Sequence, residues 1–231
     1  MFVLAASGLK AAGGAVAPPD YLFQIKTPMP FSVGAVYDRQ PIDAEFQGHI
    51  EKVEFTHIYG VLGLDPLKGV SLYGRAGQSQ CELKERHEDG SGFEWGVGMR
   101  LRLWEYRLDA PYYLKGRWGL ELFGDYSKHE SDLEGTDAQW TEKYGALMMS
   151  WELRDPFTYV KDWEECYSLV LAAGAGHSEI SGDVDGREFK ANKQFGFVGS
   201  ADIFLAKNLS LGGEVRAFDK IQTIFTAAFH F

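Results

Sequence analysis

Hydrophobic and polar residues alternate along most of the chain from Phe31 to Phe231. Ten segments have the two-residue period of a β-strand and are separated by turn-forming residues. In the clearest segment, Phe93, Trp95 and Val97 alternate with Glu94 and glycines. The segments span 31–38, 50–63, 70–82, 93–104, 117–127, 142–154, 166–178, 189–205, 208–218 and 221–231. This pattern predicts an all-β fold.

The connections between these segments differ in length and composition. Asp65–Gly69 and Lys207-Asn208 are short, whereas 84–92, 128–139 and 181–190 are polar and charged and are predicted as longer loops. An even number of antiparallel strands places both chain ends on one side of a barrel. We therefore predict a closed, antiparallel, up-and-down transmembrane β-barrel of ten strands, with eight strands as the alternative.

Alternation does not by itself say which face points inward, because a soluble barrel has the same period with apolar residues inside. Ten glycines lie on the polar face, which suits a crowded lumen better than a surface in water. Aromatic residues near the segment ends suit the girdles of a lipid-facing wall. We predict apolar side chains outside, with Val53, Phe55, Tyr59 and Val61 among them and Trp104 in the lumen. The girdle is assigned to Trp95, Trp118, Tyr126, Trp151 and Tyr167.

The polar face carries charges of both signs on separate segments. Buried charges must pair, since an unpaired one is very costly. We predict that these charges form an ionic network that plugs the lumen; a narrow ion path is the alternative. The network consists of Glu54, Arg75, Glu94, Arg100, Arg102, Glu121, Asp125, Glu142, Glu152, Arg154, Glu214 and Arg216.

Composition narrows the possible partners. The 231 residues carry a net charge of −10, which argues against nucleic acid. No run of about 18 apolar residues exists, which excludes a transmembrane helix. Residues 1–17 are predicted to be a truncated or degenerate secretion signal, with a disordered leader as the alternative, and 18–30 a proline-containing linker. Residues 31–231 form the predicted barrel domain.

Cys81 and Cys166 are the two cysteines of the chain. The strand pattern places them near opposite ends of different strands. Their Cα atoms would then lie beyond the range that a disulfide bridges, so we predict that they do not pair.

Few residues suggest catalysis. His129-Glu130-Ser131 has the histidine–serine spacing of barrel esterases, and Asp125, His129 and Asp132 could form a protease-like set, but both groups fall near or within a predicted polar loop. Neither a nucleophile elbow nor a His-Glu-x-x-His motif is present. The stretch 183–186 is predicted as a hairpin turn rather than a calcium loop. We expect no enzymatic activity, cofactor or metal.

The last eleven residues, I-Q-T-I-F-T-A-A-F-H-F, form an amphipathic segment with Phe225, Phe229 and Phe231 on one face. In this feature the chain resembles bacterial outer-membrane β-barrel proteins, whose final strand ends on an aromatic residue. The resemblance implies recognition of these phenylalanines by the barrel-assembly machinery. It also implies an outer-membrane location with periplasmic termini, and contact with lipid and lipopolysaccharide.

Two sequence segments resemble strands of the small opacity and attachment barrels. They are K-G-V-S-L-Y-G-R-A-G (68–77) and N-L-S-L-G-G-E-V-R-A-F (208–218). By analogy, this resemblance implies a non-enzymatic surface or structural role of the adhesion type, with an extracellular ligand that the sequence does not name. A small channel or transport barrel is the main alternative function.

Overall fold

The computed structural model describes residues 31–67, 69–85, 88–108, 116–133, 136–154, 168–184, 186–191, 193–206 and 209–231. The predictions for 1–17, 18–30, Cys166 and Tyr167 fall outside these residues. Eleven strands make up the described part: β1 (Phe31–Phe46), β2 (His49–Leu67), β3 (Val70–Leu83), β4 (Glu88–Leu108), β5 (Gly116–Leu133), β6 (Thr136–Arg154), β7 (Ser168–Val184), β8 (Arg187–Ala191), β9 (Phe195–Ala206), β10 (Leu209–Ala217) and β11 (Ile221–His230).

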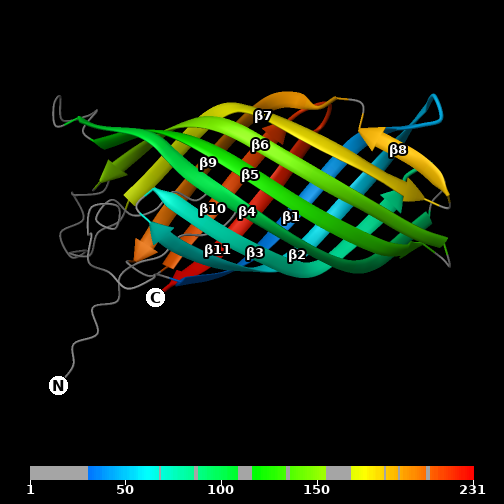
Figure 1. Ribbon diagram of the computed structural model, residues 1–231, viewed down its shortest axis with the longest axis horizontal. Coiled ribbons are helices and arrows are strands. Elements are labelled where there is room, and N and C mark those ends of the chain that lie inside the picture. The colour runs from blue at the N-terminus through cyan, green and yellow to red at the C-terminus, as the bar shows by residue number, and fades with distance from the viewer. Residues whose placement is uncertain are drawn as a thin grey trace, which may run out of the picture.

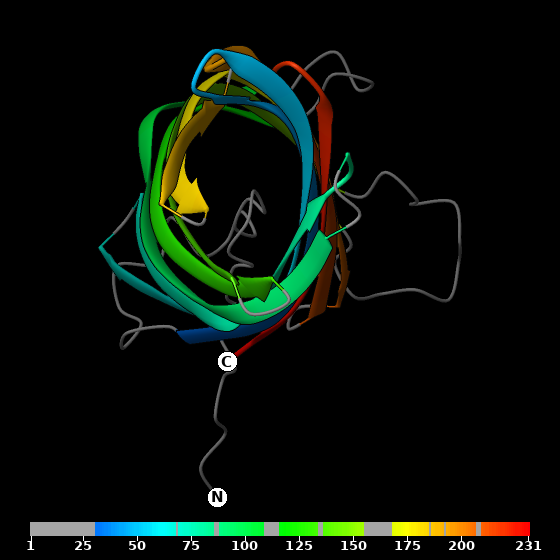
Figure 2. The same cartoon turned by 90° about the vertical axis from the view of Figure 1, so that its right-hand side faces the viewer.

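Ten of these strands close into an antiparallel ring in the order β1-β2-β3-β4-β5-β6-β7-β9-β10-β11, and β11 pairs again with β1 (Figures 1 and 2). The closing register runs from Ser32↔His230 to Arg39↔Thr223. This confirms the predicted closed ten-strand barrel. Among the described residues there is no helix long and apolar enough to span a bilayer.

The two ends of the barrel differ. At the terminal end β1 begins and β11 finishes, whereas β1, β3, β5 and β7 finish at the opposite end, called distal here (right side of Figure 1). Gly186 in the turn after β7 has a φ of 71° and its N–H donates to Asp183 Oδ1. That stretch is therefore the predicted hairpin turn.

Strands β9, β10 and β11 stop short of the distal end, and β8 replaces them there. Beyond the β10–β11 hairpin, β8 pairs with β7 on one side and with β1 on the other. The ten-membered ring is thus followed by an eight-membered one. The prediction of a single strand over 189–205 is wrong, because the strand is interrupted between Ala191 and Phe195, where the partner on the side away from β7 changes from β1 to β10.

Side chains and backbone complete the hydrogen bonding at this fork. Asp219, in the β10–β11 turn, accepts a 2.8 Å hydrogen bond from the backbone N–H of Asp43. Lys220 Nζ lies 2.9 Å from the Asp43 carboxylate. The N–H of Ser178 donates to the Gln194 carbonyl between the β8 and β9 pairings. Backbone groups that lose a strand partner at the fork are thereby satisfied.

The strands are longer than the sequence pattern predicted. β4 has 21 residues and β2 and β6 have 19 each, whereas a tilted strand crosses a bilayer with about 9–11 residues. The predicted polar loops at 84–92, 128–139 and 181–190 are wrong for most of their length, because strands β4 to β8 occupy most of these residues. These longest strands therefore have about twice as many residues as a bilayer requires.

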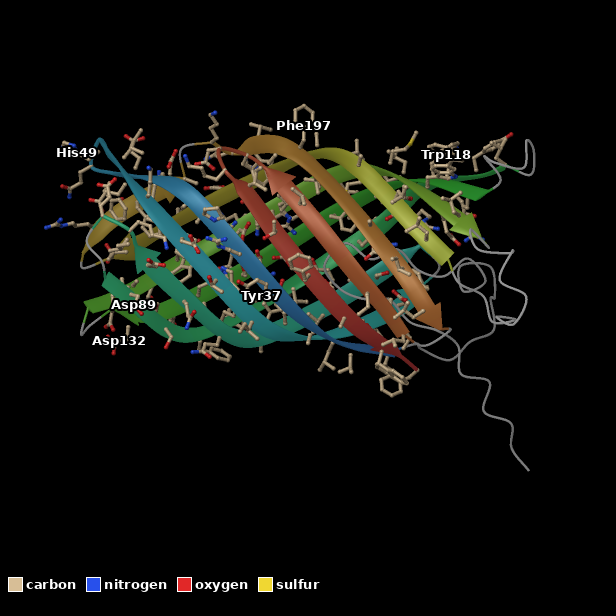
Figure 3. All side chains as sticks on the ribbon, turned by 180° about the vertical axis from the view of Figure 1, so that it is seen from behind. Tyr37, His49, Asp89, Trp118, Asp132 and Phe197 are labelled. Carbon is tan, nitrogen blue, oxygen red and sulfur yellow. The ribbon has the colours of Figure 1, made fainter. Side chains whose placement is uncertain are left out.

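The outer face divides into two zones. Over the terminal part it is an apolar belt in which Phe197 is 77% exposed and Leu62 is 68% exposed. Over the distal part it carries exposed charged and polar residues such as Lys52, Glu130 and Asp132. Figure 3 shows His49, Asp89 and Asp132 at the distal end and Trp118 toward the other end. An exposed apolar belt on a closed barrel is the signature of a transmembrane barrel.

The inner face reverses polarity at the same level. Distally the lumen is filled by an apolar core, which we call the distal plug. Phe55 of β2 stacks on Trp140 of β6 with ring centroids 4.5 Å apart, although these strands are not neighbours in the ring. The plug consists of Ile42, Ala44, Phe46, Val53, Phe55, Cys81, Leu83, Leu133, Ala138, Trp140, Ile180, Val184, Phe189 and Ala191. It closes the distal lumen as a soluble barrel core would.

The main error in the predicted faces lies in segment 50–63. The reversal explains it at Val53 and Phe55, which belong to the plug; Tyr59 and Val61 lie at the level of the belt and pack in a smaller apolar cluster of the lumen. Val53, Phe55, Tyr59 and Val61 were placed on the lipid face, but all are at most 5% exposed and point into the lumen. Trp104 was placed in the lumen and is 48% exposed, because a β-bulge between Arg102 and Trp104 changes the alternation.

Elsewhere in the belt the predicted faces are correct. Leu122 and Leu211 are exposed, whereas their neighbours Glu121 and Glu214 are buried.

The distal plug should contribute measurably to stability. Ile42→Ala removes a 4% exposed plug side chain and should lower the free energy of unfolding by about 2–5 kcal/mol through lost burial and a residual cavity. Ile50→Ala, at a 56% exposed site across the same hairpin, should change it by less than about 0.5 kcal/mol. Urea unfolding of vesicle-inserted protein, followed by tryptophan fluorescence, compares the two. Equal losses would contradict a packed distal core.

Candidate functional site in the lumen

Below the distal plug the lumen is mixed, with buried charged groups between smaller apolar clusters. The structure places eleven of the twelve predicted network residues within the described side chains; Arg154 falls outside them. Buried ones are Glu94, Arg100, Glu121, Glu142, Glu152, Glu214 and Arg216. The side chains of Arg75, Arg102 and Asp125 are 9% exposed or less. These ten residues come from five strands of the wall, so no single strand carries the network.

Toward the terminal end the network is organised around Glu121 of β5. Arg102 donates to Glu121 Oε1 through Nε and Nη2 at 3.0 and 2.7 Å, and Arg100 Nε lies 2.9 Å from Oε2. Ser150 of β6 adds a 3.2 Å hydrogen bond. One fully buried carboxylate thus holds two guanidinium groups, and neutralising it leaves both with less compensation.

At mid-height, polar contacts cross the lumen. Gln40 of β1 donates to Glu142 of β6 at 3.2 Å, and Ser178 donates to the same oxygen at 2.9 Å. The Arg216 guanidinium stacks 3.7 Å from the Tyr144 ring centroid and bonds Glu214. Contacts between non-adjacent strands fix the width of the lumen as well as its charge balance.

A second mid-height pair involves Arg75 of β3. Its guanidinium lies 3.0 Å from the Asp125 carboxylate and donates to the Tyr59 hydroxyl at 3.1 Å. With Glu121 and Glu142, these contacts place paired charges at several levels of the lumen between the plug and the terminal end, beside apolar clusters.

Glu54 does not belong to this network, and its predicted place in the lumen is wrong. It lies on the distal outer face, where Arg39 Nε donates to it at 2.7 Å and Lys84 lies 3.4 Å away. Its alternation partners Val53 and Phe55 are the residues that point inward. The error has the same cause as that for segment 50–63: the polarity of each face changes with height.

A compact cluster lies where the plug meets the polar lumen. Glu94 and His129 face each other directly in the β4–β5 register, and Glu94 Oε2 lies 3.0 Å from His129 Nδ1. The same oxygen is 2.5 Å from His57 Nδ1 of β2. Ser127 Oγ and His129 Nε2 are 2.8 Å apart. One buried carboxylate therefore bridges two buried imidazoles.

Small residues on the intervening strand allow His57 to reach Glu94. Between β2 and β4, β3 presents Gly77 and Ser79 to the lumen at this level. A Cβ at Gly77 would lie 2.2 Å from the Ile58 carbonyl oxygen, so glycine is required there. Above the cluster, Trp140 stacks on His129 with centroids 5.0 Å apart and nearly parallel planes.

The structure does not assemble the catalytic sets considered from the sequence. Ser131 Oγ is buried without a hydrogen-bond partner, and the hydroxyl at His129 belongs to Ser127 instead. Asp125 pairs with Arg75, and Asp132 is exposed on the outer wall. His129 therefore meets neither aspartate of the proposed protease set in the described contacts.

The other predicted site residues lie on the outer face. Trp118 stacks on Trp151 with centroids 5.3 Å apart near the terminal end, and Trp95 meets Tyr126 edge-on at 6.0 Å nearer the middle. Phe225, Phe229 and Phe231 are exposed along β11 and its end. Their role in assembly stays a prediction.

Sequence reasoning missed the His57–Glu94–His129 cluster. Its members are separated by 37 and 35 residues and lie on three strands, so no local motif announces them. The sequence does contain one signal, the alternation along each strand. Once the lumen-facing positions of β2, β4 and β5 are assigned, all three residues point inward at one level.

Comparisons with known proteins find structural similarity at low sequence identity. No family model and no characterised sequence matches the chain. Among solved structures, an outer membrane channel from Pseudomonas putida F1 has a TM-score of 0.40 and 14% identity over 94% of this chain and 100% of that one. The transport unit of the Escherichia coli autotransporter AIDA-I gives 0.44 and 11% over 90% and 91%. The β domain of the Bordetella autotransporter BrkA gives 0.46 and 13% over 87% and 98%.

Two matched substitutions test how strongly the lumen depends on its buried carboxylates. Glu121→Gln keeps the shape but removes the charge that pairs with Arg100 and Arg102. It should cost about 3–5 kcal/mol of unfolding free energy. Glu54→Gln, at the exposed Arg39 pair, should cost about 1 kcal/mol or less. Urea titrations of both variants in lipid vesicles provide the comparison. A Glu121→Gln protein as stable as Glu54→Gln would contradict the ionic plug.

Proposed function

We propose that this protein is a non-conducting outer-membrane barrel whose distal part stands above the bilayer and presents a polar surface to an extracellular ligand. The role is structural or adhesive rather than enzymatic. The single observation that carries this proposal is the wall that continues past the apolar belt with its polarity reversed, polar outside and apolar within.

The reversal supports the proposal because each face matches the medium it would meet. A belt of exposed aromatic and aliphatic side chains suits lipid. A charged outer wall around a dry core suits water. Strands that continue as paired ladder beyond the belt give the distal surface a rigid support, which is what a recognition surface needs.

The filled lumen argues against the alternative function of a small channel or transport barrel. Aromatic rings from β2 and β6 meet across the distal lumen, and paired charges occupy the space below. An ion crossing this path would have to displace a dry apolar core and break buried ion pairs, both of which are unfavourable.

Single-channel recording tests the closed lumen. Purified protein inserted into planar bilayers should give no stable unitary currents, because the plug and the ion pairs fill the lumen. Correct insertion of the same preparation is checked by resistance of the barrel to protease. Reproducible conductance steps from correctly folded protein would favour the channel function and overturn this part of the proposal.

Surface exposure and binding test the distal end. Cysteine placed at His49, in a background lacking Cys81 and Cys166, should react with a membrane-impermeant maleimide on intact cells, whereas cysteine at Leu67 near the terminal end should react only after lysis. Replacing Glu130 and Asp132 with lysine should reduce whole-cell adhesion to the surfaces that the wild type binds; Phe197→Leu in the belt serves as the control. Binding that is the same for every variant would remove the support for an adhesive role.

A further inference from the structure

The His57–Glu94–His129 cluster beneath the distal plug contains one carboxylate, and two neutral imidazoles do not balance its negative charge. Glu94 has no exposed surface, and its contacts in the described structure are the Nδ1 atoms of His57 and His129. The guanidinium of Arg75, on the intervening strand β3, pairs with Asp125 and donates to the Tyr59 hydroxyl. A buried carboxylate between two imidazoles requires a positive partner, either a proton or a metal ion.

The donor atoms of the three residues converge from three strands. One atom from each of His57, Glu94 and His129 lies within 4.8 Å of the others, and the imidazole centroids are 4.7 Å apart. Bonds of about 2.0 Å around a tetrahedral zinc ion separate its ligands by roughly 3.3 Å. The present separations of 2.5 and 3.0 Å from Glu94 Oε2 would therefore need to widen by less than about 1 Å.

The surroundings also fit a metal site. Ser127 Oγ lies at the remaining nitrogen of His129, the position from which a neighbouring group orients a ligating histidine. Glu94 Oε1 and His57 Nε2 are buried without a hydrogen-bond partner. Trp140 and Phe55 stack near both rings and exclude water on the distal side. Buried polar atoms that the described structure leaves without a partner at this cluster are an independent sign that a ligand belongs there.

We propose that His57, Glu94 and His129 bind a divalent transition-metal ion of the zinc class through two imidazole nitrogens and one carboxylate oxygen. Imidazole and carboxylate ligands suit zinc rather than calcium or magnesium, which prefer sites made of oxygen alone. Because the three ligands come from β2, β4 and β5, the ion would tie together one side of the barrel just below the plug. The site is independent of the proposed surface role.

Zinc content tests this site directly. The full chain is folded in detergent with zinc present, separated from free metal, and measured by mass spectrometry. Wild type should retain one zinc per chain. Glu94→Gln and His129→Asn should retain at least about tenfold less. His177→Asn removes a histidine that pairs with Gln194 away from the cluster and should match wild type. Equal zinc in wild type and Glu94→Gln, or no zinc in folded wild type, would overturn the proposal.

A measurement on wild type alone covers the case in which the variants do not fold. X-ray absorption of the zinc-loaded protein should show scattering from two imidazoles and one carboxylate. A first coordination shell without imidazole would mean that the zinc is adventitious, and would overturn the proposal even if the stoichiometry were one.

Discussion

The structure depends on one constraint: every backbone N–H and C=O of the wall must find a partner all the way around. Lipid offers no hydrogen bonds, so a strand that ended at mid-height with a bare edge would be costly. The β10–β11 hairpin does end at mid-height, and beyond it β8 pairs with β1 instead. Asp219 caps the Asp43 N–H where β1 exchanges one neighbour for the other. Ten strands can therefore give way to eight without breaking the ladder.

The second organising fact is that each face keeps its alternation while its chemistry changes with height. Along β1 the lumen-facing positions pass from Ser32 and Asp38 to Ile42 and Phe46, and the outward ones from Phe31 to Glu45. Neither face slips in register; only the medium it meets changes. The charged layers and the plug are consequences of this change of medium. Inside a lipid-facing wall the lumen can hold paired ions, whereas a wall surrounded by water needs an apolar core.

Much of this was readable from the sequence, and the failures have physical causes. Period-two alternation gave the barrel, the ten-strand ring and the faces of the membrane belt, since lipid and lumen sort side chains strictly there. It failed at Val53 and Phe55 because a single assignment of faces was applied to a strand that crosses two media. It failed at Trp104 because a bulge shifts the alternation. It failed at 128–139 because a strand whose outer face meets water has the polar composition of a loop. The cluster at His57 was hidden because its members meet only through the register of four strands.

The distal plug gives this membrane protein a thermodynamic component typical of a soluble one. The belt is stabilised by transfer into lipid, so its contribution should follow bilayer thickness and composition. The plug is stabilised by removing rings and aliphatic chains from water into a protein interior, and its exposure on unfolding raises the heat capacity whatever the lipid. The stability of the terminal part of the sheet should therefore depend mainly on the membrane, and that of the distal part mainly on temperature.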